Sequence, residues 1–104
     1  MNREQLAVCL RQEVDKWASK TVDELRREVA TPNAYEIEYE GATVTVELEI
    51  LESVPDYVHV SIDVDDGTPF RTFVPLSTSF MVFRDGRVEK VRSSGAEGRR
   101  GQTG

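Results

Sequence analysis

One histidine and the polar residues around it are the side chains in this chain best suited to acid–base chemistry. His59 has Tyr57 and Ser61 two residues away on either side, and Asp63 continues the same alternation. A histidine changes protonation near neutral pH, so His59 could serve as a general base or a pH switch. Nucleophilic catalysis would also need a nearby serine or cysteine and an orienting carboxylate. We favour a surface residue on a strand, and Tyr57, His59 and Asp63 remain candidates for binding a small ligand.

A run of aspartates further along the chain resembles the start of a calcium loop. An EF-hand loop needs ligands at alternate positions, a glycine at the sixth position and a bidentate glutamate at the twelfth. Counted from Asp63, Gly67 is fifth and the twelfth residue is Val74. The spacing fails, and turn chemistry explains the run. We therefore expect no metal and no cofactor.

The single cysteine and the single tryptophan both have apolar surroundings. Cys9 lies between Val8 and Leu10, with Arg11 as the only adjacent cation. A structural thiol is favoured over a reactive one in such a setting. Trp17 falls on the apolar stripe of a predicted helix, which favours a core residue over a ligand platform.

Charge is distributed unevenly along the chain. The net charge is −6 over 104 residues. Residues 31–66 contain no lysine or arginine, and their acidic residues are Glu36, Glu38, Glu40, Glu47, Glu49, Glu52, Asp56, Asp63, Asp65 and Asp66. Phosphate groups would be repelled by this block, which argues against nucleic acid as a partner.

Some of these carboxylates are predicted to share one face of the strands. They are Glu36, Glu38, Glu40, Glu47 and Glu49. Such a face could dock a basic protein, or imitate nucleic-acid charge and so block a nuclease or a DNA-binding enzyme. The alternative, which we favour, is a solvated surface that adds solubility and prevents aggregation between sheet edges.

Residues 3–30 are predicted to be helical. Apolar side chains recur at three- and four-residue steps: Leu6, Leu10, Val14, Trp17, Leu25 and Val29. Thr21 and Glu24 have the spacing of a capping box, in which each side chain accepts from the backbone N–H of the other residue. The segment is thus either one helix or a helix broken near Thr21. Pro32 is expected to end it.

From Tyr35 to Asp65 the apolar period changes to two, which is typical of half-buried strands. Turns are predicted at Gly41-Ala42, at residues 53–56 and at residues 65–69. Shorter strands are expected over residues 70–76, 79–83 and 88–91. The predicted fold is α+β, with an N-terminal helix packed on a four- to five-stranded antiparallel β-meander.

The later strands carry large apolar groups on both faces. Phe73, Met81 and Phe83 lie on one side, and Phe70, Phe80 and Val82 lie on the other. One helical layer covers a single face, so the first group needs a closing sheet, a second helix or another subunit over it. Exposed aromatic clusters mark interaction sites. Self-association through this surface and cover within the chain both remain open.

Length and composition predict a single domain over residues 1–92 and a disordered tail over residues 93–104. The lone cysteine and the lack of an N-terminal apolar run favour a cytoplasmic protein. No stretch is long and apolar enough for a membrane span, so no membrane partner is expected.

Three functions fit these features. The first is a non-enzymatic protein–protein interaction module, either monomeric or homodimeric. The second is an acidic inhibitor or immunity-type protein that neutralises a basic toxin or nuclease. The third is a small-ligand-binding domain or minor enzyme with Tyr57, His59 and Asp63 at the mouth of a concave sheet.

Overall fold

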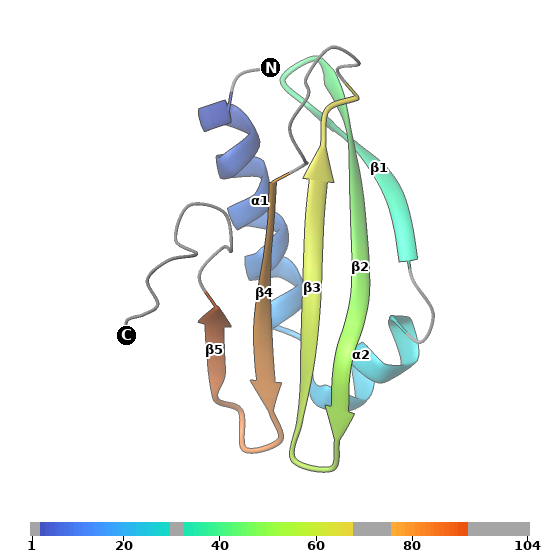
Figure 1. The fold of residues 1–104 in the computed structure, drawn as a ribbon, viewed down its shortest axis with the longest axis vertical. Coiled ribbons are helices and arrows are strands. Elements are labelled where there is room, and N and C mark those ends of the chain that lie inside the picture. The colour runs from blue at the N-terminus through green and yellow to red at the C-terminus, as the bar shows by residue number, and fades with distance from the viewer. Residues whose placement is uncertain (1–2, 30–32, 68–75, 92–104) are drawn as a thin grey trace.

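The fold is an antiparallel sheet with two helices on one face. The computed structural model of the chain describes residues 3–29, 33–67 and 76–91. In chain order its elements are α1 (Arg3–Ala18), α2 (Val22–Glu28), β1 (Asn33–Tyr39), β2 (Ala42–Val54), β3 (Tyr57–Asp65), β4 (Leu76–Phe83) and β5 (Val88–Val91). The five strands pair with their sequence neighbours in the order β1-β2-β3-β4-β5. Figure 1 shows this meander in front of both helices. The predicted α+β class and meander are confirmed.

The helical segment is broken where its sequence predicted a cap. Thr21 has extended backbone angles, its hydroxyl accepts from the Glu24 N–H at 3.1 Å, and the Glu24 carboxylate accepts from the Thr21 N–H at 2.9 Å. The second bond also lowers the pKa of Glu24, because it favours the ionised form. The reciprocal bonds satisfy two N–H groups that a helix start leaves unpaired. Two helices, rather than one with a polar middle, therefore precede the sheet.

Tight turns join the first three strands and set their register. Tyr39 pairs with Ala42, so Glu40 and Gly41 form a two-residue turn. Both have positive φ, at 50° and 82°, as a hairpin turn matched to strand twist requires. The sequence prediction of Gly41-Ala42 is wrong by one residue. Glu40 consequently points toward the helices, where it accepts from Gln5 of α1 at 3.1 Å.

The link between β3 and β4 is longer than a tight hairpin. Val64 pairs with Leu76, so residues 65–75 separate the paired positions. Gly67 has φ 77° and donates from its N–H to the Asp65 carboxylate at 3.0 Å, which is the predicted turn chemistry. The predicted strand over residues 70–76, with Phe70 and Phe73, lies outside the described residues except for Leu76, the first residue of β4. So does the tail predicted over residues 93–104.

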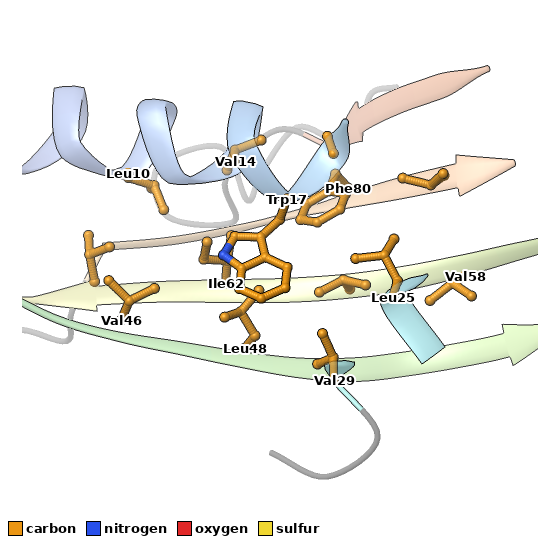
Figure 2. Packing of buried hydrophobic residues seen from close by; sticks show 14 of the residues in the cluster. Leu10, Val14, Trp17, Leu25, Val29, Val46, Leu48, Val58, Ile62 and Phe80 are labelled. Atoms are coloured by element: carbon orange, nitrogen blue, oxygen red, sulfur yellow. The ribbon is translucent and has the colours of Figure 1, made fainter. Parts of the chain in front are cut away.

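The core lies between the helices and the covered face of the sheet, here called the inner face. The fully buried side chains there are Val44, Val46 and Leu48 of β2 and Val58, Val60, Ile62 and Val64 of β3, and Phe80 and Val82 extend the layer onto β4. Trp17 and Leu25 pack down onto them from α1 and α2 (Figure 2). Each such apolar side chain contributes about 1.5–3 kcal/mol on burial, offset largely by conformational entropy. The prediction of Trp17 as core is confirmed.

Strand β2 extends well beyond its partner β1. Pairing with β1 ends at Leu48, while β2 continues to Val54 and a register shift between Ile50 and Glu52 marks a bulge. Leu51, inside the bulge, is 52% exposed. Arg26 of α2 donates to the carbonyl of Val54 and to the hydroxyl of Ser53. The overhanging end of β2 is thus bent and tied to α2.

The opposite side of the sheet, here called the outer face, is not covered by any described helix or strand (Figure 1). Every second side chain of each strand projects onto it. Neither described helix is long and apolar enough to cross a membrane.

Candidate functional site

The outer face carries most of the residues that the sequence singled out. Cross-strand pairing places Glu47 of β2 opposite Asp63 of β3, and Glu49 opposite Ser61. Glu36 lies opposite Thr45, which in turn lies opposite Asp65. The carboxylates near the β1–β2 turn and the end of β3 form what we call the acidic half: Glu36, Glu38, Glu47, Glu49, Asp63 and Asp65.

The acidic half is held together against electrostatic repulsion. Same-face partners on adjacent strands have Cβ atoms about 4.5–5.5 Å apart, where like charges destabilise a sheet. Partial burial, followed by the charges of Glu47 and Glu49, raises the pKa of Asp63 above its ordinary value. No lysine or arginine from the described residues ion-pairs with these three carboxylates. A shallow hollow of about 370 Å³ lies beside them at the start of β1.

The centre of the outer face is lined by small hydroxyl side chains. Ser61 of β3 lies opposite Ser79 of β4, and Ser77 lies opposite Asp63. His59 contacts this group, with its Nε2 atom 2.9 Å from the Ser79 hydroxyl oxygen. Sequence reasoning missed Ser79, because only the strand register brings residues twenty positions apart together.

A histidine and a serine at this distance could act as base and nucleophile, but nucleophilic catalysis also needs a group that orients the histidine. The base needs a third group, usually a carboxylate, that orients its ring. Glu52 is the cross-strand neighbour of His59, but its carboxylate accepts from the Tyr57 hydroxyl at 2.8 Å. Within the described ranges, no other residue hydrogen-bonds the His59 ring. The pair therefore lacks the orienting partner of a catalytic triad.

Apolar side chains gather at the far end of the outer face, near the β2–β3 and β4–β5 turns. We call Tyr57, Met81 and Phe83 the apolar end; all three are half-buried. The Tyr57 and Phe83 rings lie 5.3 Å apart at an angle of 50°. The guanidinium of Arg87 lies 4.1 Å above the Phe83 ring. Cover within the chain, left open by the sequence, is thus partial for Phe83, while Phe73 lies outside the described residues.

The three weak ligand-binding candidates do not converge on one pocket. Asp63 lines the shallow hollow at the acidic half, and Tyr57 lines a separate hollow of about 550 Å³ between the two turns. Tyr57 and Asp63 are six residues apart on one strand, which is about 20 Å. Among the described residues, no three His, Cys, Asp or Glu side chains are placed to hold a metal ion.

A second polar cluster lies between α1 and β1, away from the outer face. The Tyr35 hydroxyl donates to the carboxylate of Glu13, which is only 8% exposed, and accepts from the Trp17 indole at 2.8 Å. Lys16 reaches Glu13 at 3.6 Å. Burial and the bond to Glu13 raise the pKa of Tyr35 strongly. These bonds satisfy a buried acid and attach β1 to α1.

Cys9 is also buried beside this cluster. The residue is 1% exposed, and burial, with a smaller effect of the nearby Glu13 charge, raises the pKa of its thiol. A raised pKa and burial make a thiolate scarce and inaccessible, so the predicted structural role of Cys9 is supported.

The chain matches no protein-family model, no curated protein and no solved structure in the three comparisons made.

Proposed function

We propose that the protein is a non-enzymatic binding module whose outer face docks a cationic region of another protein. One observation carries the proposal: the acidic half occupies a sheet face that no described element covers. Opposite charges across an interface steer partners together and select against wrong ones. Acting in the cytoplasm is part of the proposal, because the only thiol is free and buried.

The electrostatic repulsion within the acidic half supports a binding role for it over a role in solubility alone. Scattered surface carboxylates would provide solubility without mutual repulsion. Here partial burial, together with the nearby charges of Glu47 and Glu49, raises the pKa of Asp63 and disfavours its ionised form. A local arrangement of side chains that lowers the stability of the fold is characteristic of functional sites. A cationic partner would relieve that repulsion.

Self-association through the whole outer face is disfavoured by the same charges. Two copies stacked with like ends together would place carboxylates against carboxylates. Stacked with opposite ends together, they would place the carboxylates against the apolar end, where Arg87, the only cation among the described outer-face residues, lies above Phe83. Like-charge contacts across an interface cost several kcal/mol. An inhibitor or immunity-type protein that binds a basic toxin or nuclease is the special case in which the cationic partner is harmful.

The proposal predicts that removing two charges from the acidic half weakens binding to a cation-rich peptide. The probe is a fluorescently labelled oligolysine, titrated while its anisotropy is measured. We expect Glu47→Gln with Glu49→Gln to weaken binding about five- to tenfold, which corresponds to about 1.0–1.4 kcal/mol. Raising the salt concentration should weaken binding of the unmodified protein as well.

The matched control removes the same charge from the helical side. Glu4→Gln with Glu28→Gln changes the net charge equally but leaves the outer face intact. Binding should stay within about twofold of the unmodified protein. If both double variants lose affinity equally, oligolysine responds to net charge alone and the proposal is wrong.

A further inference from the structure

The apolar end lies on the same open face as the acidic half and needs its own explanation. A solvated face would carry polar groups at these positions. Instead Met81 and Phe83 project outward from β4, and Tyr57 stands beside them on β3. Partly exposed aromatic residues on an interaction face usually act as anchors, because they bury large areas at low entropic cost.

The two ends differ in chemistry and are separated by a serine-lined floor. Three short hydroxyl side chains line this floor: Ser61 of β3, and Ser77 and Ser79 of β4. The ends are about 20 Å apart along β3. A helix of about 13 residues spans this distance at a rise of 1.5 Å per residue.

We propose that the partner segment has one cationic end and one apolar end. The cationic end lies over the acidic half, and an apolar side chain at the other end packs against Met81 and Phe83. This inference rests on the proposed function, since it describes the occupant of the same face. The acidic half sets the approach and the charge of the partner. The apolar end then supplies a hydrophobic contact, which salt does not screen, whereas the attraction between charges is screened.

The hollow beside the apolar end suits such an anchor. It is lined by the rings of Tyr57 and Phe83 and by charged residues of the two turns, which are Asp56, Arg84, Asp85 and Arg87. Arg87 stacks on Phe83 from the exposed turn between β4 and β5. Because that side chain is exposed, it can move aside or stack on an aromatic residue of the partner.

The test compares three synthetic helical peptides of about 16 residues with equal charge. The first has a lysine block at one end and a leucine–phenylalanine pair at the other. The second has the same composition with the apolar pair inside the lysine block. The third replaces the apolar pair with serine. Affinities are measured by anisotropy, and the contact is mapped by NMR shifts of the protein.

We expect the first peptide to bind about tenfold more tightly than the other two, with NMR shifts at Tyr57, Met81 and Phe83. Met81→Gln should remove most of this advantage while leaving the affinity for the serine peptide unchanged. Met81 is half-buried on the outer face, so the substitution leaves the inner core intact. Unfolding by urea checks that the variant is folded.

The outcomes separate this inference from the proposed function. If all three peptides bind equally through the acidic half, the proposed function stands and the apolar anchor is wrong. If none binds, the proposed function and the inference both fail. If sedimentation shows that the apolar end is already covered in a stable dimer at neutral pH, a second copy is its occupant and the inference is overturned.

Discussion

At the scale of single residues, the negative charge of Asp63 lowers the stability of the free protein but favours binding of the proposed cationic partner. Its carboxylate faces Glu47 across the strands and is partly withdrawn from water. Both effects disfavour the ionised form. The ionised carboxylate therefore lowers the free energy of unfolding of the unbound protein while it strengthens the attraction for a cation.

Asp63→Asn is predicted to stabilise the free protein at neutral pH. A folded-state pKa above the unfolded value means that the ionised group lowers stability once the pH exceeds both values. We expect a gain of about 0.5 kcal/mol, the size of one cross-strand repulsion. Urea unfolding curves at neutral pH measure it.

The gain should disappear as the pH falls below the unfolded value of 3.8, because the carboxyl is then neutral in both states. Asp56→Asn, in the turn between β2 and β3, is the control and should change stability little. An unchanged or lower urea midpoint for Asp63→Asn at neutral pH would mean that burial and repulsion do not make the ionised carboxylate destabilising.

At the scale of elements, the attachment of β1 to α1 depends on Tyr35. This strand lies at the edge of the sheet, and its inner-face side chains are only half-buried. The hydroxyl of Tyr35 serves Glu13 and Trp17, two residues of α1. An edge strand with limited apolar burial is thus fixed to the helix by polar bonds.

Tyr35→Phe is predicted to destabilise the fold by about 1–3 kcal/mol, because the buried Glu13 carboxylate loses its donor. Tyr39→Phe, from the same strand face, is the matched control and should cost much less. Urea unfolding measures both. The pKa of Tyr35 is raised above 10.0, so its stabilising effect is complete below that pH and is lost as the pH rises further. The two proteins should therefore converge at alkaline pH; a constant difference would contradict this account.

The elements themselves could be predicted well from the sequence, but their register could not. Alternation from Tyr35 to Asp65 correctly assigned the buried and exposed faces of β1, β2 and β3, because a period of two leaves little choice when one face is apolar. The contact of His59 with Ser79 depends on which residue of β4 faces which residue of β3. The number of residues between Val64 and Leu76 decides that, and the sequence does not show where pairing with β3 resumes.

The position of Glu40 could not be predicted from the sequence either, because it depends on the geometry of the turn. Grouping Glu40 with Glu36 and Glu38 followed the alternation, but the turn begins at Glu40 and sends its side chain toward Gln5. Turn type depends on backbone angles at two residues, and only Gly41 signals positive φ in the sequence. The remaining carboxylates share the outer face as predicted.

At the scale of the whole molecule, charge and apolar surface divide the outer face into two ends. The chain has a net charge of −6 and a sequence pI near 4.8. At neutral pH repulsion should keep copies apart despite the exposed apolar end.

We therefore predict a monomer at neutral pH that self-associates as the pH approaches 4.8. Neutralising the carboxylates removes the repulsion and leaves the Met81 and Phe83 contact unopposed. Light scattering across this pH range measures the mass. Met81→Gln should reduce the association, and a mass that does not change with pH would show that charge does not control contact between copies.

The end of β2 that extends beyond β1 has a backbone edge without a strand partner among the described residues. An unpaired strand edge is a template on which further copies can add and grow into cross-β fibrils. Here the bulge at Leu51 bends the template, and Arg26 occupies the carbonyl of Val54. Carboxylates on either side of the bulge would stack on their own kind in any in-register fibril. This unpaired end of β2 is thereby a poor seed for amyloid.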